Sequence, residues 1–528
     1  MRTMKKRPGI FNDVIGPIMR GPSSSHTAAS WRAAKIAMDI LNEPLHKAVI
    51  DFDKDGAWAP NYREQGTTIG IDGGLLGLDM TDDRIKNTEQ LAAERGIAIT
   101  YEVNSYSTTH VNTFRLNLEG TEGKHTQIVA VSIGGGSFEI TAVDGFEVSI
   151  CGDAYELLLI AANGHITLAD LKDCLPEHNH IQESFNAHKQ LVQLRFSSPV
   201  PEQHIEALKQ QFDLEEVLVI DPVLPIVAGN ECELPFHTVA EMLEFAANED
   251  VDLGAIGLMY EQYQSGLTAN EVIDQMKYVV RIIEQSIQTG LSGTHYEDRI
   301  LPQQSHLIAK AATRKKILEN SIVNTIIANV SAIMESKSAM EVVVANPTAG
   351  SCGAVGGVLR AVADDIDASE DELLQAYFAA GMIGVYFARG PGFSAEEHGC
   401  QVECGASAGM AAAGIVQLFG GSAKQAVDAA SFAIQNMIGL ICDPIADRVE
   451  APCLGKNVSA AVNALSSATM ARAGFDALIP LNEVIETVST VSLQMPSCNK
   501  CTGKGGLAIT KTACAIKHKL AVKNSVQI

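Results

Sequence analysis

Three cysteines in the C-terminal third of the chain have the surroundings of metal ligands. Cys400, Cys442 and Cys453 each lie among turn-forming residues, in a region rich in Ala and Gly and poor in charge. Thiolate is the preferred protein ligand of iron–sulfur clusters, and a metal site that lacks one protein ligand can bind and polarise a substrate. The alternative is three buried structural thiols, because unpaired cysteine is among the most buried residue types. The spacing alone leaves both interpretations open.

A run of hydroxyl side chains near the start of the chain could bind an anion. Gly21–Thr27 reads Gly-Pro-Ser-Ser-Ser-His-Thr and precedes a helix predicted over Thr27–Leu41, for which Ser25 or Thr27 would be the N-cap. Hydroxyls and backbone amides at a helix N-terminus favour a carboxylate, and His26 could hold an anion or transfer a proton. The alternative is a simple N-cap beside a surface histidine.

Two further segments that carry cysteine are ambiguous. Asn346–Gly353 is a turn rich in glycine and hydroxyls, and its Cys352 begins a predicted helix, so we expect a packed thiol or part of a pocket wall. Cys498 and Cys501 have the Cys-x-x-Cys spacing, which fits a redox pair, a metal site or chance.

Composition restricts the class of protein. A chain of 528 residues is too long for one core and suggests about three domains. The formal net charge of -24 argues against nucleic acid as a partner, because phosphate binding needs clustered Lys and Arg. We find no apolar run suited to a signal peptide, nor one of about 18 residues suited to a membrane span. Eleven cysteines without a secretion signal are typical of reduced thiols, so we expect a cytoplasmic protein.

The order of the predicted elements gives a multidomain fold in three parts. Residues 1–152 form an α+β N-terminal domain, residues 153–225 a small α+β module, and residues 230–528 an all-α domain. The prolines in Asp221–Pro225 mark a boundary, since proline stops both helix and strand. After Asn346 the helices are rich in small residues, so we expect a tight bundle with the cysteine loops at its ends.

Individual elements follow from the periodicity of the apolar residues. A glycine turn at Gly134–Gly136 is expected to join two strands of a hairpin, Thr126–Ile133 and Phe138–Ile150. The small module is predicted to contain, in order, strand Tyr155–Ala162, helix Leu168–Leu175, strand Leu191–Phe196, helix His204–Phe212 and strand Val217–Ile220. Further helices are predicted over Val239–Ala247, Ala269–Thr289, Ser305–Met334, Ala354–Ala363, Ala406–Leu418 and Ser459–Ala473.

These motifs resemble, in order and over nearly the whole chain, the bacterial iron–sulfur L-serine dehydratases. The segments that resemble the β part of that family are Gly16–Thr27, Ile71–Ile85 and Val131–Thr141. The segments that resemble its α part are Pro347–Gly353, Gly399–Glu403, Cys442–Ala446, Pro452–Asn457 and Gly505–Ala508. The chain therefore resembles a fusion of the two parts, and the small module falls where two-subunit members carry an ACT-like module.

The resemblance implies a [4Fe-4S] cluster held by Cys400, Cys442 and Cys453. It implies aconitase-like chemistry, in which an open iron assists the β-hydroxyl as it leaves, a base removes the α-proton, and loss of ammonia gives pyruvate. That logic also stands on chemistry alone, because hydroxide is a poor leaving group and a Lewis acid on its oxygen assists it. Some members supply a further cysteine from the C-terminal end, and Cys514 is the candidate for a fourth, displaceable ligand.

The resemblance also implies which residues face the substrate. His26 and His110 are the catalytic candidates, and the segment around His110 matches the family's His-Pro-Asn-Thr. The residues implied to bind substrate are Ser23, Ser24, Ser25, Thr27, Asn112, Thr113, Thr348 and Asn457. The expected partners are a small amino-acid substrate and further copies of the chain, most simply as a homodimer.

Three segments depart from the family pattern. Gln65 stands where members usually have a histidine, and glutamine cannot act as a base. Asn499–Thr502 replaces the usual Arg-Glu-Thr, and Pro391–His398 replaces an Asn-x-Ser-Ile-Ser-Gly segment before the first cluster ligand. The cluster ligands are kept while pocket positions change.

Three functions remain open at this point. The first is an L-serine ammonia-lyase, and the second is a related lyase acting on L-cysteine, threonine or a β-hydroxy dicarboxylate. The third is a non-catalytic sensor that carries a cluster. The first two predict an oxygen-sensitive cluster with substrate turnover, whereas the sensor predicts binding without turnover and tolerance of His26→Ala.

Overall fold

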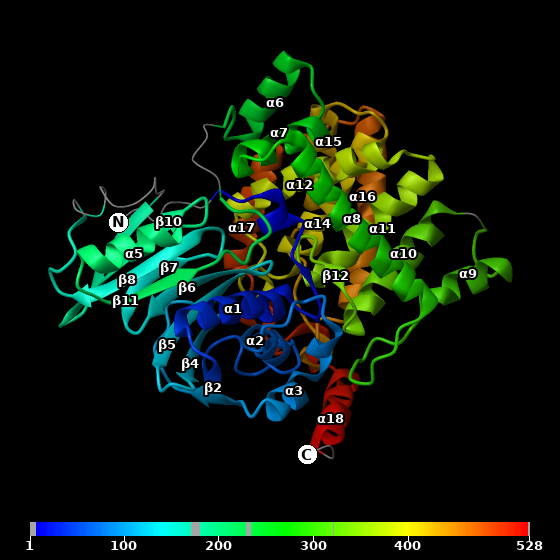
Figure 1. The fold of residues 1–528 in the computed structure, drawn as a ribbon. Coiled ribbons are helices and arrows are strands. Elements are labelled where there is room, and N and C mark those ends of the chain that lie inside the picture. The colour runs from blue at the N-terminus through cyan, green and yellow to red at the C-terminus, as the bar shows by residue number, and fades with distance from the viewer. Residues whose placement is uncertain (1–6, 169–170, 172–179, 229–233, 320, 526–528) are drawn as a thin grey trace.

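The structure is a computed structural model that describes residues 7–168, 171, 180–228, 234–319 and 321–525. Two β-sheets with their helices lie on one side of the molecule, and a large group of helices lies on the other (Figure 1). The predicted multidomain α+β fold with a helical C-terminal region is thereby confirmed. No helix within the described ranges is long and apolar enough to cross a membrane.

The first sheet has six strands in the order β3-β2-β4-β5-β6-β7, and its neighbouring strands are antiparallel except for β2 and β3. Ala48, Ile50 and Phe52 of β2 are buried and alternate with more exposed residues, the pattern of a strand with one buried face. Helices α1 and α2 share the apolar core of this sheet (Figure 1). The elements are α1 (Ala29–Leu41), β2 (Leu45–Asp53), α2 (Thr67–Leu75), α3 (Thr88–Glu94), β3 (Ala98–Asn104), β4 (Thr113–Gly120), β5 (His125–Gly134), β6 (Ser137–Val143) and β7 (Phe146–Ile150).

The second sheet has four antiparallel strands in the order β11-β8-β10-β9 and has its own small apolar core. Leu208 and Phe212, in and just after α5, belong to that core. The elements are β8 (Tyr155–Ala162), β9 (His180–Phe185), β10 (Lys189–Phe196), α5 (Glu202–Gln211) and β11 (Leu214–Ile220).

The helical part is built around α14, every residue of which is buried. Small residues permit this position: a Cβ at Gly409 would press on Ile434 of α15, and one at Gly414 would press on the backbone of Ala376 in α12. The principal helices are α6 (Val239–Glu249), α7 (Leu253–Ser265), α8 (Ala269–Ser292), α9 (His306–Thr313), α10 (Ile322–Ser338), α11 (Cys352–Asp365), α12 (Glu370–Arg389), α13 (Ala395–His398), α14 (Cys404–Leu418), α15 (Ala423–Gln435), α16 (Cys453–Arg472), α17 (Leu481–Gln494) and α18 (Lys511–Ser525).

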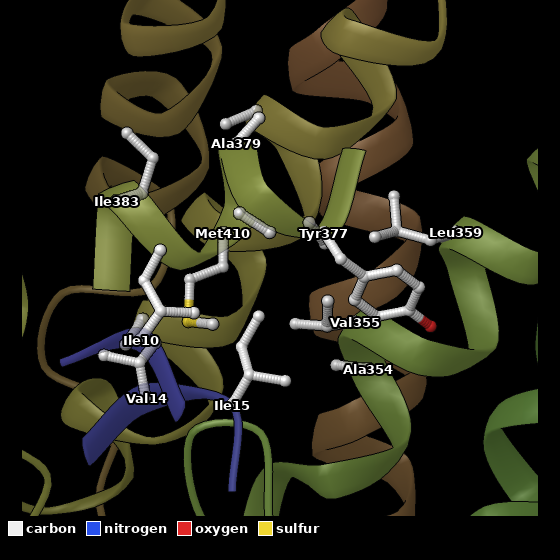
Figure 2. Close-up of a cluster of buried hydrophobic side chains, with 14 of the residues drawn as sticks. Ile10, Val14, Ile15, Ala354, Val355, Leu359, Tyr377, Ala379, Ile383 and Met410 are labelled. Carbon is white, nitrogen blue, oxygen red and sulfur yellow. The ribbon is translucent and has the colours of Figure 1, made fainter. Parts of the chain in front are cut away.

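The N-terminal segment is inserted into this helical part. Ile10 and Val14 lie beside Ile383 and Met410, as Figure 2 shows. The buried carboxylate of Glu261 in α7 accepts a hydrogen bond from the Ile10 N–H at 2.7 Å. Strand β1 (Ile18–Met19) then pairs with β12 (Val343–Val344) in an antiparallel bridge. Residues 10–19 therefore fix the path of the chain into the hydroxyl-rich turn that follows.

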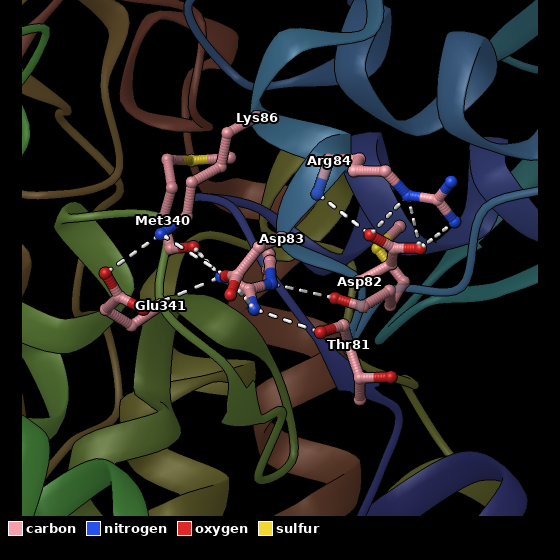
Figure 3. A network of polar contacts seen from close by, with 9 residues as sticks. Thr81, Asp82, Asp83, Arg84, Lys86, Met340 and Glu341 are labelled. Carbon is pink, nitrogen blue, oxygen red and sulfur yellow. Dashed lines mark hydrogen bonds and ion pairs between the residues drawn. The ribbon is translucent and has the colours of Figure 1, made fainter.

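A buried arginine reinforces the same junction. The Arg20 guanidinium is almost fully buried and donates hydrogen bonds to the carbonyl oxygens of Met80, at 3.0 Å, and Met340, at 2.9 Å. Beside it, Lys86 forms an ion pair with Glu341 at 3.0 Å (Figure 3). These contacts join the loop after α2 to the end of α10, so both sides of the junction are held by charge-assisted hydrogen bonds.

Several predicted boundaries are wrong at irregular backbone. Helix α1 begins at Ala29, because a π-helical turn, η2 (Ser24–Ala28), precedes it, and Ser23 accepts the capping hydrogen bond from the His26 N–H. The predicted N-caps, Ser25 and Thr27, lie inside that turn. The sequence pattern did not distinguish these positions, since all of them carry hydroxyls.

Two predicted continuous elements are divided. Ser305–Met334 forms α9 and α10 rather than one helix, and Lys315 between them has a φ of +53°. Phe138–Ile150 forms β6 and β7, because Asp144 and Gly145 adopt positive φ and reverse the chain. The predicted elements also leave out β2, β3, β4 and β9 among the strands and α7, α12, α15 and α17 among the helices. The helix predicted over Leu168–Leu175 falls mostly outside the described residues.

The close packing of α8 on α10 can be tested at one glycine. We expect Gly290→Ala to lower the free energy of unfolding by about 1–3 kcal/mol, because a Cβ there would overlap the backbone of Ala332. The urea midpoint, followed by circular dichroism, should fall. Gly455→Ala is the control: Gly455 is an exposed residue of α16 with open space around it, and its midpoint should stay the same or rise slightly. An unchanged midpoint for Gly290→Ala would contradict this contact.

Candidate functional site

Two of the predicted cysteines and one carboxylate form the centre of the site. The Cys400 Sγ, the Cys442 Sγ and a Glu403 carboxylate oxygen all lie within 4.8 Å of one another, and all three residues are buried. Cys400 begins the short turn η5 (Cys400–Val402). The preceding Gly399 has a φ of +75°, which glycine adopts without strain and which turns the chain toward the other thiol.

Cys501, for which the Cys-x-x-Cys spacing left a metal site open, lies beside this group. The Cys442 N–H donates to the Asn499 carbonyl at 2.8 Å, and the Cys501 N–H donates to the Cys442 carbonyl at 3.1 Å. Hydrogen bonds with the Cys400 and Cys501 thiols raise the pKa of Cys442. Cys498, which forms the Cys-x-x-Cys pair with Cys501, is only half-buried. Cys501 is therefore placed by its contact with Cys442 and extends the thiol group.

Cys453 approaches the same group from the start of α16. Burial raises the pKa of Cys453, and the nearby Cys400 adds to the shift. Burial likewise raises the pKa of Cys404, the first residue of α14, and Cys400 and Cys453 add to that shift. One turn into α16, Asn457 donates to the carbonyls of Cys453, at 2.9 Å, and Gly350, at 2.7 Å, and accepts from the Gly353 N–H at 3.1 Å. Asn457 thus holds the start of α16 against the start of α11.

Two lysines, the partly buried Lys456 and the fully buried Lys337, bring positive charge to the thiols. Lys456 Nζ lies 3.8 Å from the Cys400 Sγ and 2.6 Å from an Asp443 carboxylate oxygen. Burial lowers the Lys456 pKa, but Cys400 and Asp443 outweigh burial, and the net pKa is raised. Lys337 is fully buried and acts electrostatically on Cys453 and Glu403. Buried cations are costly without a counter-charge, so this arrangement suits an anionic group.

The donor set fits an iron–sulfur cluster. Cys400, Cys442 and Cys453 offer three soft ligands of the type that such clusters select. Lys337 and Lys456 can offset the negative charge of the thiolates. In the protein alone the raised pKa values keep the Cys442 and Cys453 thiols protonated at neutral pH, and a bound metal would displace these protons.

The hydroxyl-rich turn near the N-terminus lies directly against these segments. The Ser24 Oγ accepts a hydrogen bond from the Ala349 N–H at 3.2 Å, in the turn before α11. The Ser23 Oγ lies 3.0 Å from the His26 Nδ1, and that nitrogen lies 3.7 Å from the Glu396 Oε1 of α13. The structure therefore unites residues that stand more than 300 positions apart in the sequence.

His26 is fully buried, so the interpretation of a surface histidine is wrong. Its ring stacks on Trp58 with the centroids 4.8 Å apart. Burial lowers the His26 pKa to about 3, although Asn61 opposes the shift, and the imidazole is therefore neutral at physiological pH. Its Nε2 has no hydrogen-bond partner among the described residues. Buried polar atoms are normally satisfied, so this nitrogen is a candidate contact for a bound molecule.

Thr348 connects its turn to the thiol group. Its Oγ1 donates to the Glu403 Oε1 at 2.7 Å, and the other carboxylate oxygen of Glu403 lies 3.6 Å from the Cys400 Sγ. Burial raises the Glu403 pKa, while the bonds from Thr348 and Cys400 oppose the shift. Thr348 and Glu403 thus form the wall between the hydroxyls and the cysteines.

His110 lies at the rim of the site. Its side chain is 23% exposed, and its Nε2 lies 4.0 Å from the Glu397 Oε1 of α13. The His110 Nδ1 accepts from the Asn112 N–H at 3.1 Å, and the Thr113 Oγ1 donates to the His110 carbonyl at 2.7 Å. Asn112 is fully buried and donates to the Ser132 carbonyl at 3.3 Å. Helix α13 therefore presents one carboxylate to each candidate histidine.

Of the remaining predicted residues, Ser25 and Thr27 lie on the hydroxyl-rich turn, whereas Cys514 lies apart from the other thiols. Ser25 is buried, and the Thr27 Oγ1 donates to the Gln65 carbonyl at 3.0 Å. The Gln65 side chain in turn points at Cys501, with 3.9 Å between Nε2 and Sγ. Cys514 is exposed on α18, and no described contact unites it with the other thiols. Its role as a fourth ligand stays a prediction.

Reasoning from the sequence missed the charged residues of the site. Glu396, Glu403 and Lys456 each lie within a few residues of a predicted cysteine ligand, so proximity in sequence was the available signal. Lys337 had no such signal, because it reaches the site from α10 only through the fold. Glu396 lies in the segment Pro391–His398, which had been recognised as departing from the family pattern.

Comparisons with known proteins point to one family. The family described as serine dehydratase alpha chain matches residues 180–508. The chain is 32% identical over 285 residues to the probable L-serine dehydratase, alpha chain, of Bacillus subtilis (strain 168), which covers 54% of this chain and 95% of that protein. It is 32% identical over 195 residues to the probable beta chain of the same organism, covering 37% of this chain and 87% of that protein.

A single-chain relative is also similar. L-serine dehydratase 1 of Escherichia coli (strain K12) is 30% identical over 296 residues, covering 53% of this chain and 64% of that protein. Similarity to separate alpha and beta chains indicates that both parts are joined in this chain.

The burial of the thiols predicts their reactivity. We expect iodoacetamide to modify Cys514 quickly at pH 7.5 in metal-free protein and to modify Cys404 and Cys453 far more slowly. Burial shields these two thiols and raises their pKa, so little of the reactive thiolate is present below the raised pKa. Peptide mass spectrometry over time gives the rates. Urea-unfolded protein is the control, in which all three should react alike, and equal rates in the folded protein would contradict the placement of Cys404 and Cys453.

Proposed function

We propose a function from one premise, that the chain belongs to the serine dehydratase alpha chain family, with a β part fused to it. It is a [4Fe-4S]-dependent L-serine ammonia-lyase, which dehydrates and deaminates L-serine to pyruvate and ammonia. The observation that carries this proposal is the contact of the Ser23–His26 turn with Ala349 and Glu396, in segments that adjoin the buried thiol group of Cys400 and Cys442. An amino-acid carboxylate would find hydroxyls on one side and a metal on the other.

Cys400, Cys442 and Cys453 would hold the cluster, and their number supports one open iron. When bound, the cluster supplies a Lewis acid to the oxygen that leaves the substrate. Lys337 and Lys456 would offset the charge of the thiolates once a metal has displaced their protons. The protein thus contributes charge balance and exclusion of water around the group.

The residues proposed to bind substrate lie on the hydroxyl-rich turn, on the wall that faces it and at the rim of the site. Ser23, Ser24, Ser25 and Thr27 lie on the hydroxyl turn, and Thr348 with Asn457 braces the facing wall. His26 offers an unpartnered Nε2 inside the site, and His110 with Asn112 and Thr113 closes the rim. A neutral imidazole at His26 can donate to or accept from a substrate without a change of charge.

Features outside the site support further parts of the proposal. The strand order β11-β8-β10-β9, with α5 between β10 and β11, supports an ACT-like regulatory module at residues 153–225. The domain limits 1–152, 153–225 and 230–528, a homodimer and a cytoplasmic location remain proposals alongside it.

One observation favours the related lyase as a second candidate. Gln65 and Cys501 contact each other, and Glu396 acts electrostatically on Cys501. All three positions depart from the family pattern, and they meet at one place. A changed pocket could accept another β-substituted amino acid, such as L-cysteine or L-threonine.

The cluster assignment predicts the effect of one substitution. Cys400→Ser should abolish the iron–sulfur absorbance and lower kcat/KM for L-serine beyond the roughly 10–100-fold loss typical of outer contacts of a metal site. Circular dichroism should remain that of the wild type. Cys151→Ser is the control, since Cys151 lies near the small sheet and should leave iron content unchanged. Full iron content and full activity in Cys400→Ser would sink the assignment.

A further inference from the structure

Glu396 is a carboxylate held inside the candidate site by a short helix. Its side chain is 6% exposed, and its Oε1 lies 3.7 Å from the His26 Nδ1. The Ser394 Oγ donates to its Oε2 at 3.0 Å. The segment that leads into this helix is fixed to the first sheet, because Gly134 of β5 forms a β-bridge with Phe393. A Cβ at Gly134 would overlap the backbone of Ser394, so the glycine turn after β5 is what allows this approach.

The charge of Glu396 is not neutralised in the part of the chain that the structure describes. No Lys or Arg within the described ranges forms an ion pair with it, and the imidazole that faces it is neutral. Burial raises its pKa to about 7, and the neighbouring Glu403 and Glu397 add to the shift. A general base is most effective when its pKa lies near the working pH. Glu396 therefore has the proton affinity that a catalytic base needs.

The other candidate bases of the site are less suitable. Burial lowers the His26 pKa to about 3, so its neutral ring is a weak base. Gln65 carries a neutral amide, which does not accept a proton at physiological pH. His110 lies at the rim with Glu397, and both Glu403 oxygens are occupied, by Thr348 and by Cys400. Geometry thus leaves one buried carboxylate beside the hydroxyl turn that is free to take a proton.

We propose that Glu396 is the catalytic base that removes the α-proton of the amino-acid substrate. This inference rests on the proposed function and names the residue that performs its first bond-breaking step. A Glu396 oxygen takes the proton from Cα, the C–H electron pair forms the Cα–Cβ double bond, and the Cβ–O bond breaks. The oxygen leaves with the electron pair of the Cβ–O bond and gains a proton, which balances the one that Glu396 has taken, and it is released as water. The aminoacrylate tautomerises to an imine, and one water hydrolyses it to pyruvate and ammonia.

His26 has a different role in this assignment. Its Nδ1 lies 3.0 Å from the Ser23 Oγ and 3.7 Å from the Glu396 Oε1, and its ring stacks on Trp58, so the imidazole is held in place beside the base. Its unpartnered Nε2 remains available to the substrate. His26 is then a binding residue, and its loss should weaken binding more than proton transfer.

The test compares Glu396→Gln with wild-type holoenzyme reconstituted without oxygen. We expect kcat for L-serine to fall by roughly 10²–10⁴-fold, the usual contribution of a positioned base, with KM changed less than about threefold. Iron and sulfide content should stay at the wild-type level. The kinetic isotope effect on kcat with α-deuterated L-serine should rise, because proton abstraction then limits turnover. A structural defect would lower iron content and leave the isotope effect unchanged.

Two further variants serve as comparisons. Glu486→Gln, on the exposed face of α17, makes the same chemical change outside the site and should keep the wild-type kcat. His26→Gln should raise KM more than it lowers kcat. Wild-type kcat in Glu396→Gln would overturn the proposal. So would a raised KM with kcat kept, since that pattern marks a residue that only binds the substrate ammonium.

The remaining outcomes also separate the possibilities. If Glu396→Gln fails to fold or to take up iron, Glu396→Asp provides the test. It keeps the carboxylate but shortens the side chain by one methylene, which moves the carboxylate away from the substrate. A tenfold or larger fall in kcat at constant KM then supports the assignment, and wild-type kcat contradicts it. If the wild-type holoenzyme does not turn over L-serine, the proposed function fails, and this inference fails with it. Wild-type turnover combined with an active Glu396→Gln overturns the inference alone.

Discussion

The Ser24 Oγ accepts a hydrogen bond from the backbone of Ala349, 325 positions further along the chain, and the whole site depends on the docking that this contact represents. The segment of residues 10–20 leads into the hydroxyl-rich turn. Its start is fixed where Ile10 and Val14 enter the helical core, and its end is fixed by the hydrogen bonds of the buried Arg20. Hydroxyls and thiols approach each other only because both ends of this segment are fixed. The pairing of β1 with β12 sets its register.

A second constraint is electrostatic. Several thiols and carboxylates share a region from which water is excluded, and in a low dielectric such groups resist ionisation. The pKa values of Cys404, Cys453, Glu396 and Glu403 are raised for this reason. Lys337 and Lys456 provide the compensating charge on the thiol side only. The site is thus divided into a cationic half suited to a metal–sulfur group and an uncompensated half suited to proton transfer.

The sequence predicted the chemistry of the site better than its assembly. Cys400, Cys442 and Cys453 could be chosen because each lies in a turn of a segment poor in charge, and family motifs supported them. Several long helices, such as α8, α14 and α16, followed from apolar periodicity, whereas α12 did not. The π-helical turn before α1 and the break between α9 and α10 were also not predicted, since local backbone geometry leaves little trace in residue type. Lys337 reaches the site through tertiary packing alone, so no spacing rule could select it. The Cys-x-x-Cys spacing drew attention to Cys501 but could not show that its neighbour is Cys442.

The most direct test is anaerobic reconstitution of the wild-type chain with iron and sulfide, followed by assay of 2-oxo acid formation from L-serine beside L-cysteine and L-threonine. We expect the absorbance of a [4Fe-4S] cluster and pyruvate from L-serine in preference to the other two amino acids, with activity lost on exposure to air. A fully formed cluster without turnover of L-serine would contradict it.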